Sequence, residues 1–378
     1  MSATLRRAAG CVMVVGLGGA ELTGLERAWL RLVRPAGIIL FRRNIVEAAQ
    51  TRALLMQAAS LCAASSLRCV DLEGGPVDRL RDALAPMPSA QAVAQAARCS
   101  GKGRLARQNG ELIAQSVLAF GFNTTLAPVL DLALPASAEV LGARAAAAHA
   151  EGVIAYARAF LAGLGAHGVA GCGKHFPGLG GGTRDSHKET PAIARAWPEL
   201  WRQDLAPYRA LRGELPMVMV NHAAYPATPG KNRPASVSSF WIATVLRRRI
   251  GYRGLVFSDD LEMGGILEFM SIEEAAVTAI DAGTDLVEIC HSPELILRSY
   301  EALLAEAERS AAFRKLLLHR ARTAAQKRKR LFAQSNARPL PLKQMSALRE
   351  RILRFNDAIA AASGAQTAKN TISPVEVA

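Results

Sequence analysis

A glycine-rich loop carries the two residues whose types and spacing best suit proton transfer. The segment 174–191 reads K-H-F-P-G-L-G-G-G-T-R-D-S-H-K-E-T-P and places Asp185 two residues before His187. A carboxylate at this spacing can accept a hydrogen bond from the imidazole, orient the ring and raise its basicity. Because binding and catalytic groups concentrate on loops fixed to a rigid scaffold, this loop predicts a site. The alternative interpretation is a solvated loop histidine.

A second candidate pair, Asp259 and Asp260, follows the apolar run 255–258. Adjacent side chains at the end of a strand point in opposite directions, so only one of the two should face a site. A carboxylate in that place could act as a nucleophile. We therefore expect one aspartate to be the nucleophile and the other to be structural. Both could instead cap the next helix, where aspartate accepts backbone N–H bonds well.

Five further polar residues suit substrate binding. Lys174 and His175 could bind hydroxyl groups, and the lysine could alternatively form a Schiff base. Asp71 opens the segment D-L-E-G-G-P-V-D-R-L, in which Gly74 and Gly75 allow close backbone approach and Arg79 returns toward the site. Arg144 follows L-G-A after another strand-like run. Each of these could also be an ordinary surface charge.

Phosphate and metal sites are the competing interpretations of the same residues. The loop glycines lack the pattern G-x-x-x-x-G-K-[ST], so a phosphate-binding loop is weakly supported. Several residues are of metal-ligand type, namely His175, Asp185, His187, His222 and Asp259. The H-x-H pair expected of a metallohydrolase barrel is missing. We therefore expect neither a metal nor a cofactor.

The elements that must position these residues are apolar, β-branched runs separated by helical patterns. Runs of this continuous kind suit strands buried on both faces of a parallel sheet. They are 11–17, 37–41, 67–71, 124–129, 169–174, 216–221, 254–258 and 285–289. Eight strands alternating with helices predict an α/β fold, a single (β/α)8 barrel. A doubly wound open sheet is the rival.

The polar residues fall at or just past the C-terminal ends of the predicted strands, which is the catalytic face of barrel enzymes. They are Asp71, Asp131, Lys174, His175, Asn221, His222, Asp259 and Asp260. This shared placement favours one site over scattered surface charges.

The totals allow a large globular core without a transmembrane helix. Half of the 378 residues are hydrophobic, and no apolar run reaches the length of a membrane span. The N-terminal run 11–17 is predicted as a strand, although it also resembles a short secretory signal. Six scattered cysteines without a C-x-x-C pair predict reduced thiols and a cytoplasmic protein.

The net charge of +14 is concentrated partly in the segment 314–330. A basic run could meet phosphates or an anionic surface, but no aromatic residues interleave with it. We expect an exposed helix face and neither a nucleic-acid nor a membrane partner. A catalytic domain over 1–335 is predicted, followed by a helical extension and flexible tail over 336–378. The helix expected at 345–359 should lie outside the barrel.

The motifs together resemble glycoside hydrolase family 3, and within it the bacterial β-N-acetylhexosaminidases that trim N-acetylglucosamine from cell-wall fragments. The resemblance covers roughly residues 10–310 and rests on these segments: G-I-I-L-F-R-R-N (37–44), D-L-E-G-G-P-V-D-R-L (71–80), L-A-P-V-L-D-L (126–132), L-G-A-R (141–144), K-H-F-P-G-L-G-G-G-T-R-D-S-H (174–187) and F-S-D-D-L-E-M (257–263). The chain departs from the family's usual motifs at Leu72, at Pro76 and in the loop 178–182. These departures bear on the range of substrates that the chain would accept.

The resemblance implies a role for each candidate. Asp259 would be the nucleophile, and His187 the general acid/base with Asp185 as its partner. The sugar hydroxyls and N-acetyl group would be held by Asp71, Arg79, Arg144, Lys174 and His175. The implied activity is exo-acting, retaining and independent of cofactors, and its substrate is an N-acetylglucosamine glycoside. A β-glucosidase and a sugar-binding protein without turnover remain the alternatives.

Overall fold

The computed structural model describes residues 2–101, 103–182, 190–231, 233–333 and 339–363. Asp185 and His187 therefore lie outside the described residues. The predicted domain boundary near residue 335 and the predicted tail from 364 onward lie outside them as well. The division into two segments thus stays a prediction.

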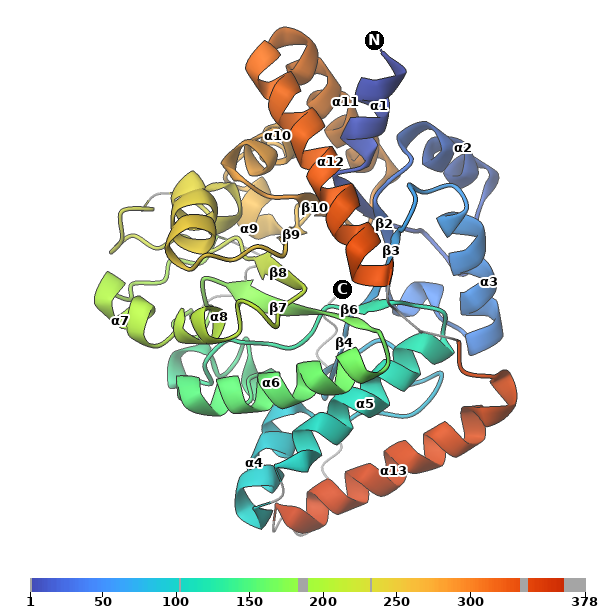
Figure 1. Ribbon diagram of the computed structural model, residues 1–378, viewed down its shortest axis with the longest axis vertical. Helices are drawn as coiled ribbons and strands as arrows, with labels where there is room; N and C mark the ends of the chain where they lie inside the picture. The colour runs from blue at the N-terminus through green and yellow to red at the C-terminus, as the bar shows by residue number, and fades with distance from the viewer. Residues whose placement is uncertain (1, 102, 183–189, 232, 334–338, 364–378) are drawn as a thin grey trace.

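Eight parallel strands close into a barrel in the order β1-β10-β9-β8-β7-β6-β3-β2 (Figure 1). They are β1 Met13–Gly16, β2 Gly37–Leu40, β3 Leu67–Val70, β6 Thr124–Thr125, β7 Ala170–Phe176, β8 Met217–Val220, β9 Leu255–Asp260 and β10 Leu286–Ile289. The barrel prediction is confirmed, and the open sheet is ruled out. The run 11–17 contributes β1, which pairs with both β2 and β10, so its prediction as a strand holds.

Helices and loops connect successive strands around the barrel (Figure 1). They are α2 Gly24–Val33, α3 Ala48–Ala59, α4 Ala90–Ser100, α5 Arg104–Ala119, α6 Ala150–Ala166, α7 Trp197–Arg202, α8 Ala206–Ala210, η5 Phe240–Arg249, α9 Gly264–Leu267 and α10 Ile272–Ala282. Helix α1 Ala3–Gly10 precedes this alternation, and helices α11 Pro293–Arg309 and α12 Ala311–Ala333 follow it. No helix in the described part of the chain is long and apolar enough to cross a membrane.

Side chains alternate between the barrel interior and the surrounding helices. The interior cluster contains Leu67 and Cys69 of β3, whereas Val70 packs outward with the helices. Strands β7, β9 and β10 follow the same alternation. Their inward residues are Ala170, Cys172, Leu255, Phe257, Leu286 and, directly after β10, Cys290. Because inward positions recur every second residue, Asp71, Lys174, Asp259 and Glu288 also belong to inward rows.

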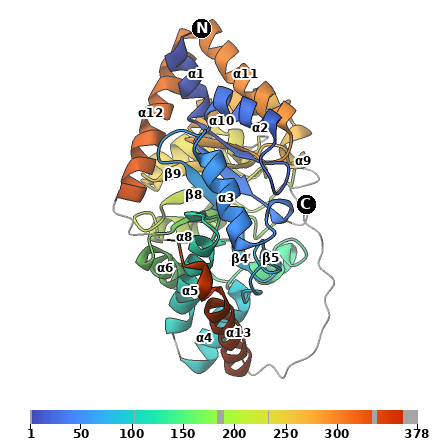
Figure 2. The ribbon, with the colours of Figure 1, turned by 90° about the vertical axis from the view of Figure 1, so that its right-hand side faces the viewer.

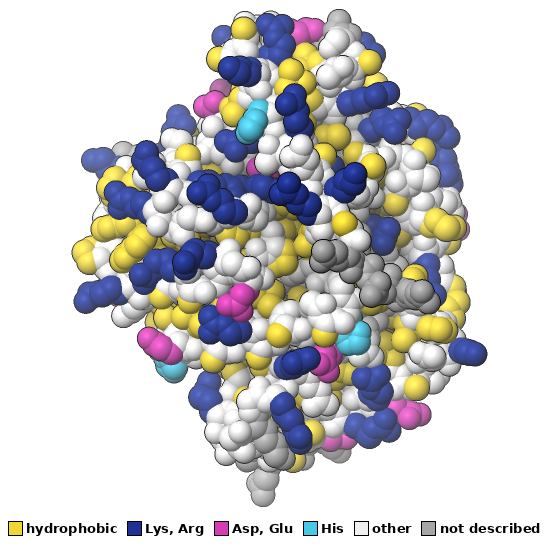
Figure 3. Space-filling model, viewed as in Figure 1, with side chains coloured by type: hydrophobic (Ala, Val, Ile, Leu, Met, Phe, Trp, Pro, Cys, Tyr) yellow, Lys and Arg dark blue, Asp and Glu magenta, His cyan; other side chains and the backbone are white. Residues whose placement is uncertain are grey.

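Helix α12 closes the N-terminal end of the barrel, and its basic residues are not all exposed as expected. Ala324 is buried in the interior cluster, with Leu331 and Phe332 packed against it. Arg328 is fully buried and donates to the carbonyl of Cys11 at 3.2 Å. Lys327 donates to Asp285 Oδ2 at 3.0 Å. The expectation of a solvated face is therefore wrong for these two cations. Lys and Arg side chains nevertheless gather on the face that carries α12 (Figure 3).

Helix α13 (Met345–Ala362) lies beside α4 and α5 at one end of the molecule (Figures 1 and 2). Leu348, Ile352, Phe355 and Ile359 are buried, as the amphipathic pattern predicts. Leu353, which the same pattern places partly on that side, is 42% exposed. The helix is therefore packed onto the helical layer and not onto the barrel strands.

Candidate active site

The inward rows of three strands bring Asp71, Lys174 and Asp259 to the C-terminal mouth of the barrel. Asp71 directly follows β3, Lys174 lies in β7, and Asp259 lies in β9. Beneath them the same rows hold apolar residues and thiols, so the polar groups begin where the strands end. The structure thus confirms that these three candidates lie together. It places them on the face where barrel enzymes hold their active sites.

The Lys174 ammonium is buried between two carboxylates. Its Nζ lies 2.8 Å from Asp71 Oδ1 and 2.7 Å from Glu73 Oε1. Burial alone would lower the pKa of Lys174, but Asp71 and Glu73 outweigh it, so the pKa lies above its usual value. A Schiff-base lysine must lose its proton to attack a carbonyl. The geometry therefore favours a fixed cation over the nucleophilic alternative.

A short hairpin inserts Glu73 into the site. It is formed by β4 (Leu72–Gly74) and β5 (Val77–Asp78). Gly74 has φ +91°, and a Cβ there would lie 2.2 Å from the Pro88 carbonyl oxygen. Only glycine fits this close approach. After the hairpin, the Arg79 amide donates to the Asp71 carbonyl at 3.2 Å, which returns the chain to the site.

Glu73 holds Arg144 through two parallel hydrogen bonds. Arg144 Nε and Nη2 each lie 2.9 Å from a Glu73 oxygen. Burial would raise the pKa of Glu73, but Arg144 and Lys174 lower it below its usual range. The carboxylate is therefore charged and bridges the buried Lys174 and the half-buried Arg144. Sequence reasoning did not identify Glu73 as a site residue.

His175 is held by Asp131, which sequence reasoning noted at a strand end but did not assign to the site. His175 Nδ1 lies 2.6 Å from Asp131 Oδ2, and the other carboxylate oxygen accepts the Leu179 amide at 2.7 Å. Arg144 Nη2 lies 3.2 Å from His175 Nε2. Since the guanidinium can only donate, Nε2 is the acceptor and Nδ1 carries the proton that Asp131 accepts. This arrangement fixes both the ring and the start of the glycine-rich loop.

Arg79 lies at the rim of the same group. Its Nη2 is 3.9 Å from Asp71 Oδ2, and its guanidinium stacks over the Phe41 ring at 5.6 Å. The five predicted binding residues, Asp71, Arg79, Arg144, Lys174 and His175, are thus brought together by direct contacts. The neighbouring Asn221, also a strand-end residue, donates to the His175 carbonyl at 2.9 Å.

The adjacent aspartates differ in their surroundings. Asp259 belongs to the inward row, and its Oδ1 accepts the Asp260 amide at 3.0 Å. Asp260 instead accepts the Glu262 amide at 3.0 Å and faces His291 at 3.5 Å. Burial, reinforced by Glu262, raises the pKa of Asp260 to about 8. This supports a nucleophilic role for Asp259 and a structural role for Asp260.

In the described part of the chain, Asp260, Glu262 and His291 could reach a common metal ion. The Glu262 carboxylate, however, already accepts the amides of Cys290 and Ser292 at 2.7 Å each, and that of His291. Arg43 Nη1 lies 3.0 Å from His291 Nδ1. Backbone amides already occupy the Glu262 carboxylate, and the Arg43 guanidinium places a positive charge beside His291. This cluster is therefore poorly suited to bind a metal cation.

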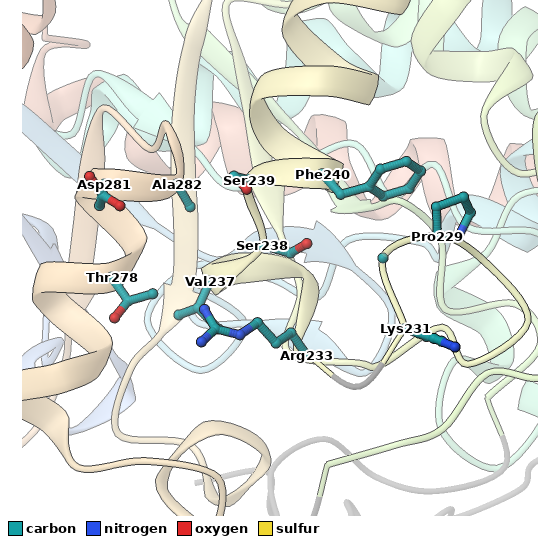
Figure 4. Close-up of a pocket in the computed structure, with 11 residues that line it drawn as sticks. Pro229, Lys231, Arg233, Val237, Ser238, Ser239, Phe240, Thr278, Asp281 and Ala282 are labelled. Atoms are coloured by element: carbon teal, nitrogen blue, oxygen red, sulfur yellow. The ribbon is translucent and has the colours of Figure 1, made fainter.

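A separate hollow of about 180 Å³ lies between the loop after β8 and helix α10 (Figure 4). Its lining includes Lys231, Arg233, Ser239 and Asp281. None of the candidate site residues that the structure describes lines it. The chemistry described above is therefore not located there.

Comparison with known proteins shows the family of this chain. The model of the glycosyl hydrolase family 3 N-terminal domain matches residues 13–317. A β-hexosaminidase of Alkalilimnicola ehrlichii is 39% identical over 287 residues, which is 75% of this chain and 82% of the relative.

Two solved structures are similar in fold and sequence. A family 3 β-N-acetylglucosaminidase from Paenibacillus sp. str. FPU-7 has a TM-score of 0.81 and 32% identity, over 94% of this chain and 69% of that one. NagZ from Neisseria gonorrhoeae has a TM-score of 0.74 and 30% identity, over 94% and 98%. The gonococcal protein has also been solved with N-trifluoroacetyl-D-glucosamine and with a zinc ion. The chain therefore belongs to glycosyl hydrolase family 3 and is a glycoside hydrolase of the hexosaminidase type.

Proposed function

We propose that this chain is an exo-acting, retaining β-N-acetylglucosaminidase that removes terminal N-acetylglucosamine from cell-wall-derived glycans. The observation that carries the proposal is the continuous chain of contacts from Asp71 through Lys174, Glu73 and Arg144 to His175. Buried, mutually oriented donors and acceptors of this kind suit a sugar whose hydroxyl and amide groups must all be satisfied. The names of the relatives support the same sugar.

In the proposed reaction, the Asp259 carboxylate attacks the anomeric carbon while His187 gives a proton to the departing glycosidic oxygen. The products of this step are the free aglycone and a glycosyl ester on Asp259. His187 then takes a proton from water, whose oxygen attacks the same carbon and releases the carboxylate. Asp185 would orient the imidazole. The unperturbed pKa of histidine, ~6.5, suits both roles near neutrality.

The loop that carries His187 would position it after the sugar binds, in the way lids complete a catalytic group. Two hydrogen bonds hold the residues on either side of this segment. Tyr225 Oη donates to the Gly178 carbonyl at 2.8 Å, and Thr190 Oγ1 donates to the Gly265 carbonyl at 2.6 Å. Both ends of the loop are thus fastened to the body of the protein.

A cytoplasmic location belongs to the same proposal. Six cysteines are free, and four of them, Cys62, Cys69, Cys172 and Cys290, are buried. Reduced thiols are typical of cytoplasmic proteins.

Turnover of 4-nitrophenyl glycosides tests the proposed sugar. A site built for an acetamido group leaves polar groups unpaired when that group is missing. We expect kcat/KM for the N-acetyl-β-glucosaminide to exceed that for the β-glucoside by at least about a hundredfold. A preference for the glucoside would instead identify a β-glucosidase. Sugar binding without turnover of either compound would identify a binding protein.

A further inference from the structure

His222 is a buried histidine at the barrel mouth that the proposed reaction leaves without a role. It lies two residues past the end of β8 and is fully buried. Its Nδ1 lies 2.7 Å from Ser236 Oγ, and its Nε2 lies 2.9 Å from the backbone carbonyl oxygen of Asp260. A carbonyl oxygen can only accept a hydrogen bond, so Nε2 carries a proton and donates it. In the neutral ring, Nδ1 then accepts the hydrogen bond of the Ser236 hydroxyl, which fixes this tautomer.

Backbone hydrogen bonds hold His222 and Ser236 beside each other. The Ser236 amide donates to the Asn221 carbonyl at 2.9 Å, which brings the serine hydroxyl next to the ring. The Asn221 amide in turn donates to the Phe176 carbonyl of β7 at 2.9 Å. The segment that carries His222 is therefore attached to the barrel, and the ring is oriented by the fold itself.

The carbonyl that His222 holds belongs to the residue whose amide contacts the nucleophile. The Asp260 amide donates to Asp259 Oδ1 at 3.0 Å, and such a bond favours the charged form of the carboxylate. The register between β8 and β9 runs up to the pair Val220 and Ser258. The bond from His222 to Asp260 lies two residues beyond this pair on both segments. It therefore extends the connection between the two strands past the ladder, to the level of the nucleophile.

Other hydrogen bonds hold the same stretch of β9 from the side of β10. Asp260 is in register with the buried Glu288, and the Leu261 amide donates to the Glu288 carbonyl at 2.9 Å. The Asp260 carbonyl also accepts the Met263 amide at 3.1 Å, which is a contact within the strand end itself. His222 supplies a connection on the β8 side. Because this connection comes from a side chain, a substitution can remove it and leave the strand ladders in place.

We infer that His222 is a positioning residue for the reaction, which orients the Asp259 carboxylate by holding the carbonyl of Asp260. The inference rests on the proposed function, because it assumes that Asp259 attacks the anomeric carbon. His222 acts through the backbone of Asp260, so its effect does not require the Asp260 carboxylate. A misplacement of about 1 Å at a reacting group can cost about a hundredfold in rate, which is why a single bond at this point matters.

Two variants of His222 separate positioning from packing. His222→Gln can place an N–H donor close to the position of Nε2, whereas His222→Leu fills a similar volume without a donor. We expect the Leu variant to lose about tenfold to a hundredfold in kcat/KM on 4-nitrophenyl N-acetyl-β-glucosaminide, and the Gln variant about threefold or less. The inhibition constant of N-acetylglucosamine should change by less than about threefold in both. The reason is that the contacts of Glu73 with Lys174 and Arg144 are untouched.

A series of aryl N-acetyl-β-glucosaminides distinguishes an effect on the nucleophile from one on the proton donor. Every substrate needs the nucleophile, so kcat/KM of His222→Leu should fall by the same factor for good and poor leaving groups. A loss that acts through His187 should instead grow as the leaving group becomes poorer. Asn109→Leu is the stability control, because the fully buried Asn109 donates to Tyr156 Oη at 3.1 Å in the helical layer. It should lower Tm and keep kcat.

Nitrogen-15 NMR of labelled histidines tests the hydrogen bond without any turnover. The signals of His222, assigned by their loss in His222→Gln, should show the tautomer that is protonated at Nε2. If His222→Leu does not fold, Ser236→Ala takes its place, because it removes only the bond that fixes the tautomer. That variant should lose about threefold to tenfold in kcat/KM, by the same factor across the leaving-group series.

Three results would overturn the inference. They are a ring protonated at Nδ1 alone, wild-type kcat/KM in His222→Leu or in the Ser236→Ala variant that replaces it, and a loss that grows with poorer leaving groups. If the wild type hydrolyses no N-acetylglucosaminide, the proposed function fails and the kinetic role of His222 fails with it. The nitrogen spectrum would still show whether His222 donates from Nε2, so the two failures are distinguishable.

Discussion

At the scale of single residues, the site is a chain of buried and half-buried charges in which Lys174, Arg144 and Arg79 each have a carboxylate partner. Glu73 occupies the centre of this chain because it contacts both Lys174 and Arg144. Breaking a buried ion pair leaves an uncompensated charge and costs about 3–5 kcal/mol. The substrate-binding residues are therefore positioned by one another, and a change at Glu73 should affect both binding and folding.

We predict that Glu73→Gln raises KM about tenfold or more and lowers the stability by several kcal/mol. The uncharged amide of the Gln variant cannot balance the positive charges of Arg144 and Lys174, so both side chains lose their orientation. Steady-state kinetics and urea unfolding would measure the two effects. Glu111→Gln removes a carboxylate from an exposed helical pair with Arg107 and serves as the matched control. An unchanged KM for Glu73→Gln would show that Arg144 and Lys174 do not hold the sugar.

The two adjacent aspartates give a second residue-scale prediction. Asp259→Asn should abolish turnover while leaving the fold intact, since the carboxylate forms the covalent intermediate. Asp260→Asn should retain substantial kcat, because burial keeps that group largely uncharged near neutrality. Rates with the 4-nitrophenyl N-acetylglucosaminide and circular dichroism of both variants would check this. The reverse pattern of activities would exchange the two assignments.

At the scale of elements, the barrel could be predicted from the sequence because its strands are continuous apolar runs. The ends of those runs located Asp71, Lys174 and Asp259, since parallel strands deliver their last residues to one mouth. The partnerships could not be predicted in the same way. Asp131 and His175 are 44 residues apart, and Glu73 and Arg144 are 71 apart, so only the closed fold brings them together.

Helix α12 shows a different limit of sequence reasoning. Its composition is that of a solvated basic helix, and its tertiary role depends on where it lies. Because α12 crosses the N-terminal strand ends, Lys327 and Arg328 meet carbonyls and Asp285 instead of water. The burial of Glu288 was invisible for a related reason: one acid in an apolar strand does not reveal which side of the barrel wall it faces.

Truncation of the C-terminal extension tests whether helix α13 supports the active site. We predict that a chain ending near residue 338 keeps most of its kcat at 25 °C, because α13 contacts helices and not the barrel mouth. Its melting temperature should fall, because Leu348, Ile352, Phe355 and Ile359 leave a buried face. Kinetics and thermal unfolding of the truncated protein would measure both. A folded protein with lost kcat would mean that α13 supports Arg144 through α4 and the short turn η3 (Gly142–Arg144), which α4 contacts.

At the scale of the whole molecule, the two ends of the barrel have separate tasks. The N-terminal end is closed by α12, and the C-terminal end carries the site. Among the described residues at that mouth, Lys174 and Arg144 pair with Asp71 and Glu73, and Asp131 pairs with His175. The proposed proton transfer uses a histidine. The reaction as proposed therefore requires no bound cation.

We accordingly predict that dialysis against EDTA leaves kcat and KM unchanged within error. Asp260, Glu262 and His291 are the described residues closest to a metal site, but their carboxylate and imidazole groups are already engaged by amides and by Arg43. A structural zinc site would contribute to folding, so the melting temperature should be followed alongside the rate. Zinc added back to the dialysed protein is the informative control, because a zinc complex of the gonococcal relative has been solved.

Loss of activity on dialysis with recovery on zinc addition would contradict the proposed mechanism and assign the chemistry to a metal-bound water. Inhibition by added zinc without any loss on dialysis is compatible with it, because an ion can occupy the imidazole or carboxylate that the reaction needs free.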